Sequence, residues 1–232
     1  MVRRMSREFY EAQWAKGNVP IKLRGLGLDS YEPVISTKTG RPHASGLIAM
    51  EESKRFVAEF ANHFISTVRA DSGDLPKDRS NIGRGLMFYG RNGTRKTTLA
   101  TAILTEVQFR SPSWGGFYIR FSDWKRYLTD TFSSGRENSD IAKKMLQRAE
   151  NWPLLVLDDI GQEHRTATGF TESVLHELLR NRYEAARPTI ITTNIPPDDM
   201  RSTYGASLDS FRFDAFDAYE MLGQDSRKIE RN

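Results

Sequence analysis

The chain has 232 residues, a formal net charge of +4 and no cysteine, with 38% hydrophobic and 11% aromatic residues. Without cysteine it forms neither disulfides nor thiolate metal sites, and its apolar content excludes wholesale disorder. The mild basic excess permits a polyanionic partner without requiring one.

The sequence also argues against a secreted, membrane or histidine-bound metal protein. The N-terminal stretch "MVRRMSREFY" is charged and no apolar run follows it, so it does not resemble a secretory signal. No stretch approaches the roughly 18 apolar residues that a membrane span needs. The four histidines are scattered without the spacing of a metal-binding motif. We therefore expect a soluble, cytoplasmic protein.

The first part of the chain predicts a helical arm and a connector. Residues 5–16 show apolar side chains near a helical period, and Gly17 and Asn18 end this helix. Residues 18–46, rich in glycine and proline, predict an extended connector. Residues 46–68 predict one long amphipathic helix. We therefore divide the chain into an arm and connector, residues 1–45, and a main domain, residues 46–232.

From residue 85 onward, strands and helices are expected to alternate, which is typical of an α/β domain. The expected strands are 85–90, 115–121, 153–160 and 188–194, and the expected helices are 97–109, 122–132, 140–150 and 171–186. The last forty residues, 193–232, are predicted to be mostly helical. The almost continuous apolar run over 153–160 is typical of a central parallel strand.

The stretch "GRNGTRKTT", residues 90–98, lies between a predicted strand and a predicted helix, which is the context of a phosphate-binding loop. Gly90 permits the turn, and Gly93 lets the backbone approach phosphates closely. Lys96 would reach the β- and γ-phosphates, and Thr97 would offer its hydroxyl to Mg²⁺. The candidate nucleotide-binding residues are Gly90, Arg91, Asn92, Gly93, Thr94, Arg95, Lys96, Thr97 and Thr98, with ATP and Mg²⁺ as cofactors.

Arg95 departs from the phosphate-loop pattern, which has glycine before the lysine. If the loop needs a positive φ at this position, arginine is strained by roughly 1–2 kcal/mol. Its guanidinium is also a phosphate ligand in its own right. The sequence indicates a real nucleotide site with slow or altered hydrolysis, and binding without useful turnover is the alternative.

Polar residues end two further predicted strands. Asp158 and Asp159 follow "LLVL", where the first would support Mg²⁺ and the second would orient or deprotonate the attacking water. Asn194 ends the next strand, where α/β sheets bind ligands, and would hold that water near the γ-phosphate. The alternatives are a helix cap for the aspartates and an ordinary turn residue for the asparagine.

Arg212 and Arg227 are the arginines that would stabilise phosphate charge, in cis or from a neighbouring subunit. The alternative for each is a solvated surface arginine.

The chain resembles the AAA+ ATPases of the DnaC-type helicase loaders and the related IstB transposition ATPases. The stretches that carry the resemblance are "GLMFYGRNGTRKTTLATAI", "YIRFSDWKRYL", "LLVLDDIGQE", "LLRNRYEAARPTIITTNIP" and "YGASLDSFRFDAFDAYEMLGQDSRK". The likeness covers roughly residues 45–228. It implies a three-layer P-loop NTPase fold, in which an AAA+ core has a central parallel sheet flanked by helices, with no helical lid.

The resemblance also implies a role for each matched residue. These are Walker A for Lys96 and Thr97, Walker B for Asp158 and Asp159, first sensor for Asn194, arginine finger in trans for Arg212, and second sensor for Arg227. The family often has Ser-Arg-Leu near the finger, whereas Phe211 separates Ser210 from Arg212 here. The exact finger residue therefore stays open.

Residues 124–148 mix basic and aromatic side chains, as proteins that bind single-stranded nucleic acid do. The candidate DNA contacts are Lys125, Arg126, Lys143 and Lys144. In the resembling family this region carries a helix that contacts single-stranded DNA. The alternative is a pair of amphipathic helices with solvated basic faces.

Phe9, Tyr10 and Trp14 give the arm an aromatic character. They either dock on their own domain or anchor the arm in a partner's groove. In helicase loaders the segment before the ATPase core grips the helicase, so the resemblance makes these residues the partner-binding hypothesis.

The resemblance implies an ATPase that loads a hexameric DnaB-type replicative helicase onto single-stranded DNA. Such a protein assembles into a ring or spiral on its partner or on DNA. One alternative is an IstB-like transposition ATPase that acts with a transposase. The other is a nucleotide-binding adaptor with weak or no hydrolysis because of Arg95.

Overall fold

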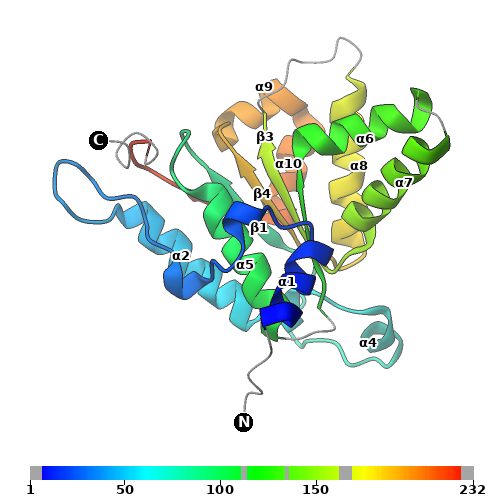
Figure 1. Ribbon diagram of the computed structural model, residues 1–232, viewed down its shortest axis with the longest axis horizontal. Coiled ribbons are helices and arrows are strands. Elements are labelled where there is room, and N and C mark those ends of the chain that lie inside the picture. Colours follow the sequence, from blue (N-terminus) through cyan, green and yellow to red (C-terminus); the bar gives the residue numbers. More distant parts are fainter. Residues whose placement is uncertain (1–6, 111–113, 134–135, 162–168, 226–232) are drawn as a thin grey trace.

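The computed structural model describes residues 7–110, 114–133, 136–161 and 169–225 (Figure 1). Within these residues one parallel sheet has the strand order β2-β3-β4-β1-β5. The strands are β1 (Gly85–Tyr89), β2 (Gly116–Arg120), β3 (Leu154–Ile160), β4 (Thr189–Thr193) and β5 (Phe216–Glu220). The α-helices are α1 (Arg7–Lys16), α2 (Ala44–Ala58), α3 (Phe60–His63), α4 (Thr67–Asp71), α5 (Lys96–Arg110), α6 (Phe121–Ser133), α7 (Arg136–Asn151), α8 (Phe170–Glu184), α9 (Met200–Tyr204) and α10 (Ala206–Ala215). Short 3-10 turns are η1 (Ile21–Leu23), η2 (Leu28–Ser30) and η3 (Pro197–Asp199).

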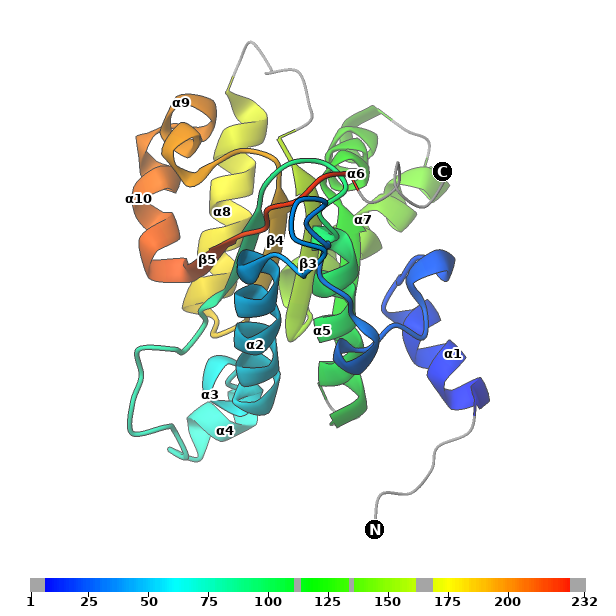
Figure 2. The ribbon, with the colours of Figure 1, turned by 90° about the vertical axis from the view of Figure 1, so that its left-hand side faces the viewer.

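The sheet lies between two layers of helices (Figures 1 and 2). Side chains alternate across a strand, so Leu86 and Phe88 of β1 enter one core while Met87 enters the other. The first core joins the sheet to α1, α2 and α5, and the second joins it to α6, α7, α8 and α10. This arrangement is the three-layer P-loop NTPase fold that the sequence predicts. No helix among the described residues is long and apolar enough to cross a membrane.

The long helix expected over residues 46–68 is wrong, because the structure breaks it into α2, α3 and α4. Phe64 adopts an extended backbone, and the Ile65 N–H donates to the Ala186 carbonyl at 3.2 Å. Phe56, Phe60 and Phe64 still form a continuous row of ring contacts. Aromatic residues at helical spacing are therefore compatible both with one continuous helix and with a helix that ends in a turn.

The prediction of mostly helix after residue 193 is wrong for residues 216–220. These residues form the edge strand β5, which pairs in parallel with β1. In the stretch "FDAYE" only Phe216 is buried, and the other four residues are intermediate or exposed, as on an edge strand. The four other strands are confirmed, with bounds that differ by at most one residue at each end.

A fully buried arginine ties the second layer to the sheet. Arg182 of α8 donates to the carbonyls of Ala149, Glu150 and Trp152 at 2.8–3.0 Å. It also donates to the Pro188 carbonyl and the Thr189 hydroxyl at the start of β4. The guanidinium therefore caps the carboxyl end of α7 and joins it to the neighbouring strand.

Candidate nucleotide-binding site

The predicted phosphate loop connects β1 to α5 at the carboxyl edge of the sheet. Gly90 and Gly93 have φ values of 140° and 76°, and Arg95 has a φ of 63°. The Thr94 hydroxyl donates to the Arg91 carbonyl at 2.9 Å and tightens the turn. The loop is therefore formed in the conformation that the glycine pattern predicts, although arginine occupies a left-handed position.

Lys96 is held at the centre of the loop and is only 7% exposed. Its ammonium donates to the carbonyls of Gly90 and Arg91 at 2.7 and 2.8 Å. It also donates to the Asn194 side-chain oxygen at 2.9 Å, so the phosphate loop and the end of β4 share this cation. The structure thus brings together two residues that the sequence assigned to one site from distant positions.

Both carboxylate oxygens of Asp158 accept hydrogen bonds, although the side chain is only 4% exposed. Oδ1 accepts from the hydroxyls of Thr97 and Thr192 at 2.7 and 2.6 Å, and Oδ2 accepts from the Tyr118 hydroxyl at 2.7 Å. Burial first, and the Asp158 carboxylate second, raise the pKa of Tyr118, so its hydroxyl stays protonated and donates. Sequence reasoning missed Tyr118 and Thr192.

Asp159 lies in a β-bulge of β3. Leu157 pairs with Ile191 and Ile160 pairs with Thr193, so two residues of β3 face one residue of β4. Asp159 has a φ of 64°, and its carboxylate accepts from the Asn194 amide at 3.4 Å. The bulge turns the second aspartate of the pair toward the phosphate-loop end of the sheet, in contact with Asn194.

The donor set at Thr97 and Asp158 suits Mg²⁺. Their hydroxyl and carboxylate oxygens lie 2.7 Å apart, and Mg²⁺ prefers oxygen ligands, taking one or two from the protein and the others from phosphates and water. Within the described residues no group of three or more His, Cys, Asp or Glu could hold a metal by itself. Thr97 and Asp158 would therefore hold Mg²⁺ together with a nucleotide.

The Arg95 side chain turns to the connector. Its guanidinium donates to the Glu32 carbonyl at 3.0 Å and lies 3.8 Å from the Glu32 carboxylate. Tyr31, the connector residue before Glu32, is also buried. The loop is thereby tied to residues that the sequence placed in a separate arm and connector.

A C-terminal strap, residues 221–225, covers the phosphate loop. The Met221 N–H donates to the Tyr89 carbonyl at 2.8 Å, and the Leu222 N–H donates to the Ser45 hydroxyl at 3.0 Å. A Cβ on Gly93 would lie 1.9 Å from an Asp225 carboxylate oxygen. Glycine at position 93 therefore allows the strap to approach the loop closely, and it also adopts the positive φ at little cost. Arg227, the predicted second sensor, lies outside the described residues.

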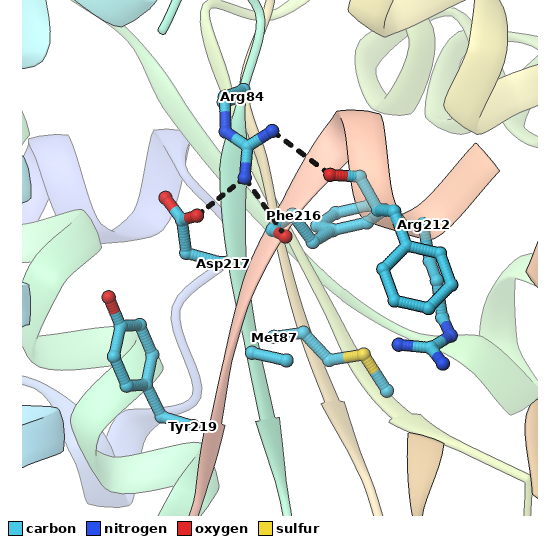
Figure 3. A pocket seen from close by; sticks show the side chains of 8 residues that line it. Arg84, Met87, Arg212, Phe216, Asp217 and Tyr219 are labelled. Carbon is cyan, nitrogen blue, oxygen red and sulfur yellow. Dashed lines mark hydrogen bonds and ion pairs between the residues drawn. The ribbon is translucent and has the colours of Figure 1, made fainter. Parts of the chain in front are cut away.

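Arg212 lies on α10, whose buried residues belong to the second core, and it lines a pocket beside β5 (Figure 3). It forms an ion pair with Asp209 at 2.8 Å, and its guanidinium lies 3.9 Å from the centre of the Phe213 ring. This pocket has a volume of about 360 Å³. In the same pocket Arg84 donates to the Asp214 carbonyl and the Asp217 carboxylate, which fixes the end of α10.

The four candidate DNA contacts lie on the α6–α7 hairpin. Arg126, Lys143 and Lys144 are exposed, and Lys125 is partly exposed above the Phe121 ring. Arg126 also pairs with Asp123 at 3.1 Å. Of the aromatic side chains in this region, Trp124 is buried in the core and Phe132 is 78% exposed.

Phe132 has a ring partner that the sequence did not indicate. Its ring centre lies 6.5 Å from that of Phe170 at the start of α8, in an edge-to-face arrangement. Phe170 is itself 49% exposed. The two residues are far apart in the sequence, so only the fold reveals an exposed aromatic pair beside the basic hairpin.

The arm docks on its own domain. Trp14 is 8% exposed, and the Tyr10 and Trp14 rings both contact Phe109 of α5, with centres 4.5 and 5.6 Å apart. Phe9 is partly exposed and contacts Tyr10 edge to face. In this structure Tyr10 and Trp14 pack on α5, which is the docking alternative, and the partner-binding role of Phe9, Tyr10 and Trp14 stays a prediction.

The fold and the site together define a P-loop NTPase with an AAA+ core. The defining features are the parallel order β2-β3-β4-β1-β5, the phosphate loop after β1, the carboxylate pair on β3 and the amide after β4. Residues 77–210, more than half of the chain, match the family model described as IstB-like ATP binding protein. The chain belongs to this ATP-binding family.

One curated sequence and two solved structures among those similar to this chain have names that describe their function. The replicative helicase loader DnaI of Bacillus subtilis is 26% identical over 119 residues, which span 51% of this chain and 36% of that protein. Among solved structures, the DnaC helicase loader superposes with a TM-score of 0.65 at 22% identity, covering 88% of this chain and all of that one. The replication initiator DnaA bound to AMPPCP and single-stranded DNA gives 0.60 at 14% identity, covering 89% and 55%. At these identities the two structural likenesses show the fold alone.

Proposed function

We propose that the chain is an ATP-dependent loader that delivers a hexameric replicative helicase onto single-stranded DNA. The observation that carries this proposal is the linked cluster of Lys96, Asn194, Thr97 and Asp158, in a chain whose sequence relative is a helicase loader. The assembled phosphate loop supports the proposal of nucleotide binding, and the sequence likeness to the DnaI helicase loader supports the proposal that the partner is a replicative helicase.

In the proposed ATPase, Lys96 binds the β- and γ-phosphates, and Thr97 and Asp158 hold Mg²⁺, which neutralises phosphate charge. Asp159 orients and deprotonates the attacking water with help from Asn194, because their side chains contact each other at 3.4 Å. Lys96 now donates to carbonyls of its own loop. A bound nucleotide would take over some of these hydrogen bonds.

Arg212 is proposed as the finger that serves a neighbouring copy. Arg212 lies on α10, in the helical layer on the other side of the sheet from α5. The phosphate loop of the same chain leads into α5, so this position supports action on a neighbouring copy. The ion pair of Arg212 with Asp209 would have to open for that role. This reasoning implies a ring or spiral in the active state.

Single-stranded DNA is proposed to bind the α6–α7 hairpin. Exposed cations at Arg126, Lys143 and Lys144 supply phosphate contacts, and the Phe132–Phe170 pair supplies a surface for base stacking. Phe132→Ala should weaken binding of a fluorescent oligonucleotide by about 1–3 kcal/mol. Ile141→Ala, at another exposed apolar position of the hairpin, is the control and should change affinity little.

Co-purification with the host's replicative helicase tests the whole proposal. The full chain should recover helicase, and helicase loading onto single-stranded DNA should require ATP and fail for Lys96→Ala. Ala12→Arg on the exposed face of α1 should reduce recovery, whereas Ala185→Arg, on another exposed surface, should not. These substitutions are preferable to deleting residues 1–17, because deletion also removes Trp14 from the core. Recovery of no helicase would refute the loader.

The family match favours one second candidate, an IstB-like ATPase that assists a transposase. It predicts recovery of a transposase in place of the helicase, and tighter binding to duplex than to single-stranded DNA. The same purification and oligonucleotide assays therefore separate the two functions.

A non-hydrolysing adaptor is favoured by one observation, the arginine at a left-handed position of the loop. Under that function, Arg95→Gly should raise the ATPase rate by orders of magnitude. The loader proposal expects a change of only a few-fold, since the loop already holds the conformation that glycine would allow.

A further inference from the structure

Tyr118 connects the candidate Mg²⁺ ligand Asp158 to the outer edge of the sheet. Its hydroxyl donates to Asp158 Oδ2 at 2.7 Å, and both side chains are less than 5% exposed. They come from neighbouring parallel strands, where Arg120 is the residue that pairs with Asp158. Tyr118 therefore reaches Asp158 diagonally, on the face of the sheet that α5 covers.

The other donors to Asp158 have further tasks in the proposed ATPase. The Thr97 hydroxyl is the proposed second protein ligand of Mg²⁺, and the Thr192 hydroxyl also accepts the Asp159 N–H of the bulge. Tyr118 is the donor to Oδ2 among the described residues, and no nucleotide role is assigned to it. Loss of its hydroxyl would free that oxygen to rotate out of position.

The arm holds the backbone of the same tyrosine. β2 is an edge strand, and the Tyr118 N–H on its outer side donates to the Gly17 carbonyl at 2.8 Å. The Asn18 side-chain amide donates back to the Tyr118 carbonyl at 2.9 Å. The end of the arm therefore adds a short pairing segment to β2, at the residue that supports Asp158.

The sequence at this junction suits the contact. A Cβ on Gly17 would lie 2.6–2.7 Å from the Gln108 amide and the Gly116 carbonyl, so only glycine lets the chain approach β2 this closely. Asn18 has a φ of 56°, a left-handed conformation that asparagine adopts more readily than most residues. On either side of the junction, Trp14 and Val19 are buried in the core.

We propose that Tyr118 is a positioning residue for Asp158, and that the arm, through Gly17 and Asn18, holds Tyr118 in that position. A partner that lifts the arm would then loosen Asp158 and change how strongly Mg²⁺ supports nucleotide binding and hydrolysis. This proposal rests on the proposed ATPase site and adds a physical connection between that site and the arm.

The test measures binding of a fluorescent ATP analogue to the full chain, with Mg²⁺ and with EDTA. Tyr118→Phe keeps the ring in the core and removes only the hydroxyl. We expect its affinity in EDTA to equal that of the wild type, and the gain in affinity from Mg²⁺ to fall about tenfold, as for one hydrogen bond to a charged group. In steady-state assays with Mg²⁺, KM for ATP should rise by a similar factor, and kcat should fall because Asp158 is less well positioned.

Tyr219→Phe is the matched control, because the Tyr219 hydroxyl contacts Glu52 at 3.3 Å on another part of the sheet. It should leave the gain from Mg²⁺ unchanged. An equal gain for Tyr118→Phe and the wild type would overturn the positioning role. A wild-type chain that binds no nucleotide in either condition would instead overturn the ATPase site, and the positioning role with it.

The contribution of the arm is tested by Asn18→Gly, which keeps the left-handed backbone and removes the amide. It should reduce the gain from Mg²⁺ in the same direction as Tyr118→Phe. The double variant should be no worse than Tyr118→Phe alone, because both changes act through one hydrogen bond to Asp158. Multiplying effects, or no effect of Asn18→Gly, would show that the arm does not act through Tyr118.

Discussion

Position 95 offers a direct test of the loop conformation, through a comparison of Arg95→Gly with Arg95→Ala. Both variants lose the hydrogen bond from the guanidinium to the Glu32 carbonyl and the 3.8 Å ion pair with an 84% exposed carboxylate. They differ only in the backbone freedom of the new residue. Any difference between them therefore reports on the φ of 63°.

The size of that difference follows from two opposing terms. A left-handed backbone costs alanine roughly 1–2 kcal/mol, and glycine escapes this cost. Glycine loses about 0.5–1 kcal/mol more chain entropy than alanine on folding. With the middle of each range, Arg95→Gly should be roughly 0.7 kcal/mol more stable than Arg95→Ala, which is about 1–3 °C in Tm for a chain of this size.

Urea denaturation of the two variants, followed by binding of a fluorescent ATP analogue, provides the assay. Both variants should bind the analogue within about threefold of each other, because the loop is already arranged before the nucleotide arrives. An alanine variant as stable as the glycine variant, or more stable, would refute the reasoning, since residue 95 would then not be left-handed in solution.

Three further predictions concern charge and burial. Lys96→Ala should weaken ATP binding at least about tenfold in an equilibrium titration, because it removes the cation at the centre of the loop, and unchanged affinity would place the nucleotide elsewhere. Arg182→Met should lower the free energy of unfolding, measured in urea, by about 3 kcal/mol, because five acceptors at the α7–β4 junction lose their donor. Arg180→Met, at an exposed arginine of the same helix, is the control and should change the free energy of unfolding little. Burial, the largest influence, lowers the pKa of His63, so below about pH 6.5 the unfolded chain binds a proton that the folded chain does not, and stability is lost as the pH falls. His63→Gln should therefore show a smaller loss of Tm between pH 7.5 and 5.5 than the wild type, and an equal loss would contradict the assignment.

The central sheet could be predicted because its strands are long apolar runs that end in glycine or polar residues. The phosphate loop and Asn194 follow two such strands and the aspartate pair lies near the end of a third, and parallel strands bring their carboxyl ends to one edge. β5 could not be predicted in this way. Its sequence offers no long apolar run, because only Phe216 is buried, and its strand conformation is held by parallel pairing with β1.

Tyr118 and the Phe132–Phe170 pair show a second limit of sequence reasoning. A tyrosine within an apolar strand carries no local sign that it supports a carboxylate, because the contact depends on the register of β2 against β3. Thr192 could have been predicted, because it lies directly before Thr193 and Asn194, the polar residues at the carboxyl end of β4. The arm could be assigned as a helix, whereas its docking on α5 depends on the position of Phe109.

The junction of Gly17 and Asn18 with β2 has a consequence for the solution behaviour of the chain. A strand edge with open N–H and carbonyl groups is a template for pairing with another molecule, and β2 lies between two apolar layers. The docked arm occupies that edge at Tyr118. A partner that removes the arm must therefore shield β2 itself, or the released edge becomes a route to aggregation. Shortened versions of this protein that begin after the arm would carry the same liability.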